Sequence, residues 1–361
     1  MSWFRRTRRS TSPLRIALLG AGGAAGIHGL AARSGGHRVV AVASGELALA
    51  AARAGETGGE PMEVDELVDR AAELADVVVV TAPVEVRAEL VMRLLDPLRH
   101  PAGDRSAPVV LVEPVLCATL AEADAVVAAS EAAGGRLCYG EHLLHAPVVG
   151  GVLDRLPAIG ALTHLEVVTI GAGRDEHAAA LVDLGPRAVA LALAAAGRLR
   201  LGPPIEVMAR AEAPRAVVGD APGDVTVELR FAGDRVLQLR IGHRSDGTTM
   251  WHVQAAGATG VVRGELLPFP SLDATGSADR GAMPRRDDDT VVALGYAAQL
   301  DASGRAKDPG AQVWRPDAVF GRDVLDVVSA ACRSLGREGT PTPLPYVGPR
   351  GVEPHALLRG G

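Results

Sequence analysis

The chain has 361 residues, with 37 Lys and Arg against 43 Asp and Glu, and a formal net charge of −6. At roughly 100–200 residues per domain, this length suggests two domains or three. The negative charge excludes a nucleic-acid binder built on bulk positive charge. Apolar runs such as 188–196 are much shorter than the ~20 residues of a spanning helix, which argues against a membrane protein.

The cysteines and the first residues bear on location. Three cysteines, Cys117, Cys138 and Cys332, form no C-x-x-C pair, which predicts a reduced cytoplasmic protein without disulfides and without a metal site. Residues 1–13 carry several arginines, and no apolar segment follows that would make them a secretory signal. We expect a flexible basic arm, and the alternative is a contact with an acidic partner.

From residue 14 to about 139, short apolar runs alternate with Ala-rich amphipathic stretches. Strands are expected at 14–19, 38–43, 77–80, 109–112 and 136–139, and helices at 24–34, 84–95 and 120–133. The four valines of 77–80 are typical of a parallel strand covered on both faces. This alternation predicts an α/β fold that begins with a Rossmann domain, a doubly wound parallel sheet, over residues 14–145.

After about residue 150 the pattern changes to alternating apolar and polar residues. Strands are expected at 162–170, 205–211, 225–231, 236–241 and 250–255, with one more short strand after 256–260. Residues 271–289 are expected to be loop, and 318–335 a helix. We therefore predict a C-terminal α+β domain with an open, mainly antiparallel sheet over 146–317, followed by a C-terminal helix and tail over 318–361.

A glycine loop stands directly between the first strand and the first helix. Its sequence, Gly20-Ala-Gly22-Gly23-Ala24-Ala25, has the form G-x-G-x-x-A. Gly20 permits a tight turn, Gly22 lets the backbone approach a pyrophosphate, and Ala25 replaces a third glycine. The following helix start offers N–H groups to the phosphates. The loop predicts dinucleotide binding, and the alternative is a glycine-rich turn without a ligand.

The end of the second strand bears on which dinucleotide is bound. The acid that would hold the ribose hydroxyls is expected about 20 residues after the loop, where the chain has Ser44 and then Gly45. Because serine does not repel a 2′-phosphate, this favours NADP slightly over NAD. Arg53 is the nearest candidate for the phosphate, although such a helix arginine is more often solvated. NAD and NADP both stay open.

Several landmarks in this order resemble the glucose–fructose oxidoreductase/inositol dehydrogenase (Gfo/Idh/MocA) family, over roughly residues 14–344. The opening loop with His28 is similar to that of the family, and Thr81-Ala82-Pro83 resembles its Thr-Pro-Pro turn. Glu113 resembles the start of its Glu-Lys-Pro motif, and 140–147 its entry into the second domain. The resemblance implies an NAD(P)-dependent oxidoreductase with these residues beside the cofactor.

The departures from the family concern its chemistry. The lysine of Glu-Lys-Pro is replaced by Pro114, and Lys307 is the sole lysine of the chain. Asp183 resembles the start of the family's Asp-x-x-x-His motif, but Arg187 stands in place of the histidine that exchanges the substrate proton. Loss of a proton-transfer residue typically costs roughly 10²–10⁴-fold in rate. Since a guanidinium keeps its proton, sugar oxidation in the manner of the family is expected to be impaired.

Four residues are candidates to replace the lost groups. His142 and His145 follow the last Rossmann strand and could move a proton, or they could only hydrogen-bond backbone. Asp183 is either part of the site or a cap of the helix that starts near Pro186. Arg187 in the first turn of that helix indicates an anionic ligand or a pair with Asp183.

Three other histidines are weaker candidates. His177 lies upstream of Asp183 in an Ala-rich stretch, and we expect little of it. His243 and His252 would suggest a metal, but no carboxylate stands at ligand spacing.

Two functions follow from these observations. The first is an NAD(P)-dependent oxidoreductase that transfers hydride to or from a small or conjugated substrate, without the usual Lys/His pair. Reduction of an unsaturated acceptor needs a hydride donor and a placed acid, but no base for an alcohol. The second is a catalytically degenerate protein that serves as a nucleotide-binding or scaffold partner. In both cases we expect a homodimer or homotetramer through an exposed apolar face of the C-terminal sheet.

Overall fold

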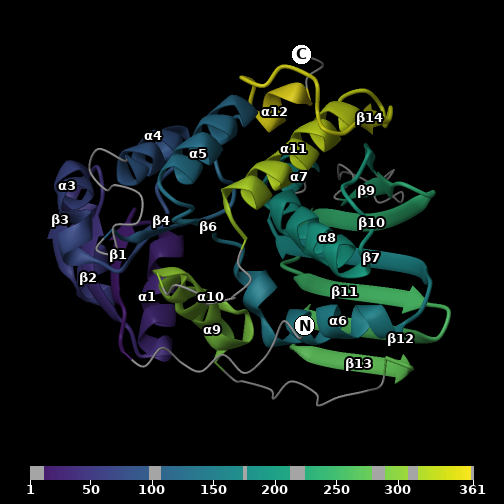
Figure 1. Cartoon of the computed structure of the whole chain (residues 1–361), viewed down its shortest axis with the longest axis horizontal. Coiled ribbons are helices and arrows are strands. Elements are labelled where there is room, and N and C mark those ends of the chain that lie inside the picture. The colour runs from purple at the N-terminus through teal and green to yellow at the C-terminus, as the bar shows by residue number, and fades with distance from the viewer. Residues whose placement is uncertain are drawn as a thin grey trace. The chain divides into compact units, whose positions relative to one another are not determined.

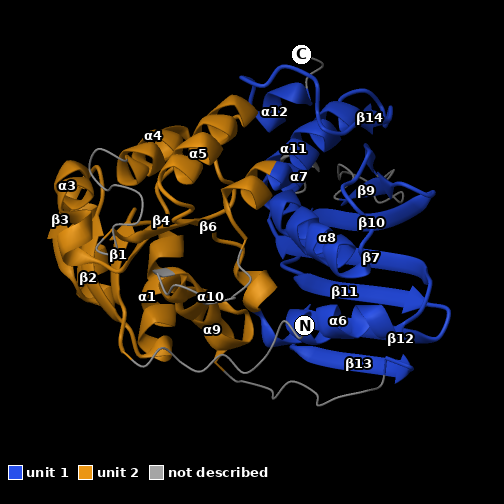
Figure 2. Cartoon of the chain, in the orientation of Figure 1, with its two compact units in different colours: residues 1–4, 146–288, 323–361 blue, residues 5–145, 289–322 orange. Residues whose placement is uncertain are grey.

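The computed structural model of the chain describes residues 12–96, 107–173, 177–211, 224–278, 289–307 and 316–358, without the side chains of 177–179 and 307. The chain divides into two compact units (Figure 2). The parallel-sheet unit, orange in Figure 2, comprises 5–145 and 289–322. The mixed-sheet unit, blue in Figure 2, comprises 146–288 and 323–361, together with residues 1–4, which lie outside the described residues.

The parallel-sheet unit holds six parallel strands in the order β3-β2-β1-β4-β5-β6 (Figure 1). The strands are β1 (Arg15–Leu19), β2 (Arg38–Ala43), β3 (Glu60–Met62), β4 (Val77–Val80), β5 (Val109–Val112) and β6 (Leu137–Tyr139). The helices between them are α1 (Gly23–Gly35), α2 (Leu47–Thr57), α3 (Val64–Leu74), α4 (Val84–Leu95) and α5 (Leu120–Ala132). The order reverses between β1 and β4, and such a switch point is where open α/β sheets bind ligands.

Burial explains why these residues form parallel strands. Every residue of β4 and β5 is buried, so side chains on both faces of the sheet are covered. The helices also carry local signals: α5 begins with a capping box, in which the N–H of Glu122 donates to the hydroxyl of Thr119 over 3.2 Å. The Rossmann prediction is confirmed, although α2, β3 and α3 were not assigned from the sequence.

The division into two units falls between residues 145 and 146, and the chain returns to the parallel-sheet unit at residue 289. Residues 289–317 were expected in the C-terminal domain, and the described part of 289–322 belongs to the parallel-sheet unit. It forms α9 (Thr290–Ala293), α10 (Tyr296–Gly304) and η3 (Arg305–Lys307). Tyr296 and Leu300 complete the core over the face of the sheet that α1 also covers. The division lies within α11 (Ala318–Leu335), so 318–361 is not a separate segment.

The mixed-sheet unit contains eight strands in the order β13-β12-β11-β7-β10-β9-β8-β14. They are β7 (Leu162–Ala172), β8 (Glu206–Ala211), β9 (Asp224–Phe231), β10 (Arg235–Arg244), β11 (Met250–Gly257), β12 (Gly260–Leu267), β13 (Ser271–Gly276) and β14 (Thr342–Pro343). Neighbours are antiparallel except β7 and β10, which run parallel. The predicted open, mainly antiparallel sheet is therefore confirmed.

Helices cover one face of this sheet (Figure 1). Those in 146–199 are α6 (Pro147–Arg155), η2 (Leu156–Ala158), α7 (His177–Asp183) and α8 (Gly185–Leu199), and α12 (Pro354–Leu357) lies near the C-terminus. Gly264 of β12 lies under α6, where a Cβ would stand 2.6 Å from Val152. The close packing of α6 on the sheet therefore depends on a glycine in β12.

One expectation for this unit needs correction, and two others fall on residues outside the described ranges. Residues 271–276 are strand β13 and not loop, because they pair with β12, for example Arg263 with Asp273. A polar edge strand lacks the alternation that would have identified it. Of the predicted loop, 279–288 lies outside the described residues, as does 1–11 of the predicted arm.

The face of the mixed sheet away from the helices carries polar residues at its centre. Gln238, Glu166, Gln254 and Arg263 stand side by side on β10, β7, β11 and β12. The prediction of a homodimer or homotetramer was based on an apolar face here. That basis is not present at the centre of the sheet, and the oligomeric state stays a prediction.

In the described ranges, no helix is long and apolar enough to cross a membrane.

Candidate functional site

A cavity of about 920 Å³ opens in the parallel-sheet unit at the carboxyl ends of β1, β2 and β4. Its lining comes from the turns after these strands and from the neighbouring helices α2, α3 and α4. The predicted cofactor residues that line it are Gly20, Gly22, Ser44, Thr81, Ala82 and Pro83. The sequence therefore brings the glycine loop, the end of β2 and the Thr81 turn to one cavity at the switch point.

The glycine loop is shaped by what surrounds it. Gly20 has φ +122°, and a Cβ there would lie 2.5 Å from the hydroxyl oxygen of Thr81, so only glycine fits. Around Gly22, by contrast, a Cβ would meet nothing within 4 Å. Gly22 is the N-cap of α1, no side chain caps this helix, and its first turn holds no acid. The first N–H groups of α1 thus lie at open space, as an anion site requires.

The other predicted cofactor residues stand behind this surface. Gly23 and Ala24 begin α1, and Ala25 is fully buried, as expected of the position that packs helix against strand. The Nε2 atom of buried His28 lies 2.7 Å from a carboxylate oxygen of Glu113. Since a carboxylate accepts, Nε2 donates to it. None of these five residues belongs to the cavity lining.

Arg87 of α4 was not identified from the sequence, and it joins two of the turns. Its guanidinium is buried and donates to the carbonyl oxygens of Ala82 (2.8 and 3.1 Å), Glu113 (2.9 Å) and Val115. Burial lowers the pKa of Arg87, although Glu113 opposes that effect. No sequence signal separates this arginine from the exposed arginines of other helices, because its acceptors are backbone atoms of distant turns.

The part of the cavity at the end of β2 differs from its predicted form. Glu46, the N-cap of α2, lines the cavity together with Ser44 and Gly45. Arg53, the candidate for a 2′-phosphate, does not line it. Its guanidinium donates to the carbonyl oxygen of Ala21 over 3.1 Å and pairs with Glu56. An acidic residue thus lines the cavity two positions after Ser44.

His142 belongs to the core of the parallel-sheet unit. It lies in η1 (His142–His145), is 1% exposed, and stacks on the ring of Tyr296 at a centroid distance of 3.7 Å. Its Nδ1 lies 2.8 Å from the carbonyl oxygen of Leu294, so Nδ1 donates. The rings of His28 and Tyr296 also form a T-shaped pair, with their centroids 5.4 Å apart. These contacts agree with the alternative of a backbone-bonded histidine, and a catalytic role of His142 stays a prediction.

His145 occupies a different environment. It is half-buried, and burial together with the nearby charge of Arg305 lowers its pKa to about 4. At neutral pH the imidazole is therefore uncharged and holds no proton to give from a cationic form. This makes it a poor general acid at pH 7.

Asp183 and Arg187 belong to the mixed-sheet unit. The N-cap of α8 is Leu184, so Asp183 does not cap this helix. Its carboxylate instead accepts a hydrogen bond from Nε2 of His243, at 3.1 Å. The guanidinium of Arg187 lies 5.4 Å above the ring of Trp251, within reach of a cation–π contact. The side chain of His177 lies outside the described residues.

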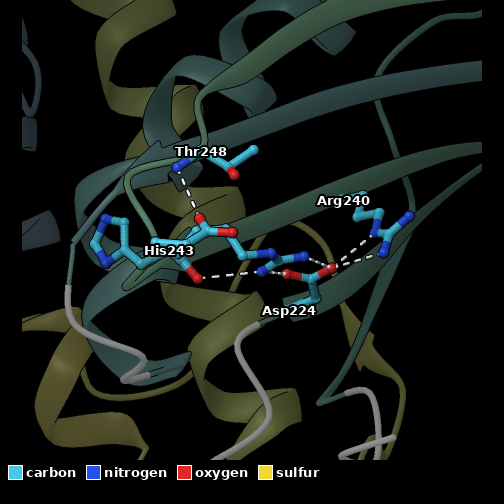
Figure 3. Close-up of polar contacts among 6 residues, drawn as sticks. Asp224, Arg240, His243 and Thr248 are labelled. Atoms are coloured by element: carbon cyan, nitrogen blue, oxygen red, sulfur yellow. Dashed lines mark hydrogen bonds and ion pairs between the residues drawn. The ribbon is translucent and has the colours of Figure 1, made fainter.

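His243 is also anchored through its main chain (Figure 3). Arg244 donates to the carbonyl oxygen of His243 over 3.1 Å and to buried Asp224, which also accepts from Arg240 over 2.9 Å. Burial works to raise the pKa of Asp224, but the hydrogen bonds from Arg244 and Arg240 hold it below its usual value. In the described ranges, no three His, Cys, Asp or Glu come together in a group that could hold a metal ion.

Similarity to known proteins is found among solved structures. No family model and no curated protein matches the chain. Among solved structures, GenD2 from gentamicin A biosynthesis, in complex with NAD, is 21% identical at a TM-score of 0.73, over 94% of this chain and 98% of that chain. An inositol dehydrogenase homolog from Azotobacter vinelandii, complexed with NAD+, is 14% identical at 0.73, over 93% and 99%.

A third structure agrees with these two. Myo-inositol dehydrogenase from Corynebacterium glutamicum is 20% identical at a TM-score of 0.69, over 92% of this chain and 99% of that chain. At such identities the likeness establishes the fold. The chain thus shares the fold of these three proteins over nearly its whole length.

We expect Arg87→Gln to destabilise the protein by about 3 kcal/mol, because it leaves buried carbonyl oxygens of two turns without a donor. Urea unfolding measures the change. Arg93→Gln is the matched control: Arg93 lies on the same helix and pairs with exposed Asp65, an interaction worth ~0–1 kcal/mol. Equal losses of stability in the two variants would contradict the role of Arg87 in joining the two turns.

His145 predicts a pH dependence of stability. Its pKa lies below that of a free imidazole, so the unfolded chain binds a proton that the folded chain does not. The free energy of unfolding should therefore fall as the pH drops from about 6.5 to about 4. In His145→Asn this contribution is absent, and the difference between urea midpoints at pH 7.5 and pH 5 should shrink. An unchanged difference between the midpoints would show that folding does not lower the pKa of His145.

Proposed function

We propose that the chain is an NAD-dependent oxidoreductase that acts on a small molecule, and a divergent member of the Gfo/Idh/MocA family. The observation that carries this proposal is the cavity at the β1/β4 switch point, where the glycine loop presents the uncapped start of α1. The likeness to GenD2 and to the Azotobacter protein, both solved with NAD or NAD+, supports the same cofactor. The inositol dehydrogenase among the similar structures supports the reaction class.

The residues present fit a dinucleotide. The backbone of Gly20, Ala21 and Gly22 would hold the diphosphate, because these residues line the cavity, Gly22 has no Cβ and the first N–H groups of α1 follow it. Ser44 and Glu46 would hold the ribose of the adenosine half. When bound, the dinucleotide supplies or accepts the hydride. In this proposal the parallel-sheet unit binds the cofactor.

We further propose NAD rather than NADP. The sequence favoured NADP slightly because Ser44 stands where an acid is expected, but Glu46 lines the same cavity. A carboxylate there accepts hydrogen bonds from ribose hydroxyls and repels a 2′-phosphate. Arg53 does not compensate, since it is paired with Glu56.

One observation favours the alternative of a degenerate binding protein. The chain has a single lysine, Lys307, and no lysine in the Glu113-Pro114-Val115 segment. A binding protein would take up NADH without oxidising it in the presence of any carbonyl or enone compound. An oxidoreductase would do both, so NADH fluorescence and NADH consumption on one panel of compounds separate the two functions.

Gly22→Ala tests the cofactor site. We expect NADH affinity, measured by fluorescence quenching, to fall at least tenfold, because a methyl group would stand where the diphosphate approaches. Stability should not fall, since φ is −70° and the added Cβ meets nothing within 4 Å. Gly55→Ala in α2 is the matched control, because Gly55 is equally unobstructed and does not line the cavity. Equal affinity in both variants would contradict nucleotide binding at this loop.

Glu46→Gln tests the cofactor preference. The wild-type protein should bind NADH at least tenfold more tightly than NADPH, and the substitution should lower that ratio about tenfold by removing the repulsion of the 2′-phosphate. Glu85→Gln is the control, because Glu85 is exposed on α4 and does not line the cavity. A wild-type protein that prefers NADPH would refute the assignment of Glu46.

A further inference from the structure

His243 and Asp183 form a pair of the kind that moves protons. The carboxylate oxygen of Asp183 can only accept, so the 3.1 Å contact fixes the proton of His243 on Nε2. Nδ1 is then the atom that gains or loses a proton, and in the described ranges it has no hydrogen-bond partner. A carboxylate that orients an imidazole and leaves its second nitrogen for the substrate is the general arrangement of acid–base catalysis.

The surroundings hold the imidazole in place. The side chain of His243 is 10% exposed, and the backbone of Gly173 packs against the ring, where a Cβ would lie 2.9 Å from Cγ. Its carbonyl oxygen accepts from Arg244, which is itself fixed by buried Asp224. Figure 3 shows the ring pointing away from the Asp224 cluster. The ring is thus fixed from both its side chain and its main chain, as a proton-transfer group requires.

Unsatisfied polar atoms lie on the same face of the sheet. Thr169 of β7 and Trp251 of β11 pair in register, and Gly171, two residues after Thr169, pairs with His243. The hydroxyl of Thr169, a fully buried residue, and the buried indole N–H of Trp251 have no hydrogen-bond partner in the described structure. Buried polar atoms of this kind call for a partner, and the described residues do not provide one. Both can donate to an oxygen atom of a ligand.

We infer that His243, oriented by Asp183, is the residue that exchanges a proton with the substrate, a small carbonyl compound or alcohol with a further oxygen that Thr169 and Trp251 recognise. This inference rests on the proposed function. In the reducing direction the carbonyl carbon takes a hydride, with its two electrons, from a reduced nicotinamide dinucleotide. The C=O π bond breaks, the oxygen takes the Nδ1 proton of the imidazolium form of His243, and a hydronium ion from the solvent returns a proton to the neutral imidazole that remains.

Other candidates are less suited to this step. Arg187 keeps its proton at any accessible pH. His142 is buried and bonded to backbone, and His145 is uncharged at neutral pH. An imidazole from β10 therefore supplies the titratable group that is absent at position 187 of α8. Asp183 serves it as the positioning residue.

The experiment compares the wild-type protein with His243→Gln, which keeps bulk but cannot exchange a proton. NADH oxidation is followed with a panel of small aldehydes, hydroxyketones, 2-oxo acids and enones. We expect kcat to fall at least 100-fold in His243→Gln, with NADH binding unchanged. His164→Gln is the matched control, because His164 is exposed on β7 at a position that carries no predicted role. It should leave kcat within twofold.

Two further variants separate catalysis from structure. Asp183→Asn should lower kcat about tenfold and leave KM within threefold. In His243→Gly, added imidazole should restore a measurable part of the rate, which a merely structural histidine would not allow. Thermal unfolding checks the fold of each variant, and His243→Asn carries the same test if His243→Gln does not fold.

Each outcome of these measurements bears on a different claim. If His243→Gln keeps kcat within threefold of the wild type, the inference is overturned. It is also overturned if the wild-type protein binds NADH and reduces no member of the panel, although nucleotide binding then stands. Absence of NADH binding by the wild-type protein overturns the proposed function itself.

Discussion

The close approach of two turns at the end of the parallel sheet is the constraint on which the candidate site depends. The turns follow β1 and β4, which are neighbours only because the strand order reverses there. Gly20 brings the first turn against Thr81 of the second, with no room for a Cβ. Arg87 then ties the second turn to the turn after β5 by hydrogen bonds to backbone oxygens. A buried guanidinium is tolerated here because each of its bonds satisfies a carbonyl group that would otherwise be buried alone.

What the sequence predicts well is what local chemistry dictates. The valine run of β4 and the glycine loop before α1 are identified from a few adjacent residues, because burial on both faces and a tight turn leave a direct mark on composition. The two-sheet architecture follows from the same local signals. The polar edge strand β13 leaves no such mark, because its pairing with β12 requires no apolar alternation.

The parts that escaped prediction are contacts across long stretches of chain. Tyr296 packs on His28 and His142, which precede it by more than 150 residues, so α10 was assigned to the wrong domain. Arg87 recognises backbone atoms, which have no signature in side-chain patterns. At the end of β2 the chain turns into α2 and brings Glu46 to the cavity beside Ser44. Counting positions from the glycine loop does not give this placement, because it depends on how the chain turns.

The same distinction bears on the chemistry of the mixed-sheet unit. Read along the chain, Arg187 marks a lost proton-transfer group, since the resemblance leads one to expect histidine at that position. In the fold, His243 reaches Asp183 from another element, 60 residues away in sequence. Proton transfer requires a titratable group such as an imidazole, a group that orients it and access to the reacting oxygen, and none of these requires a particular place in the sequence. A motif that is incomplete in sequence can therefore be complete in space, and the Asp183–His243 pair is the arrangement by which this chain would retain acid–base chemistry.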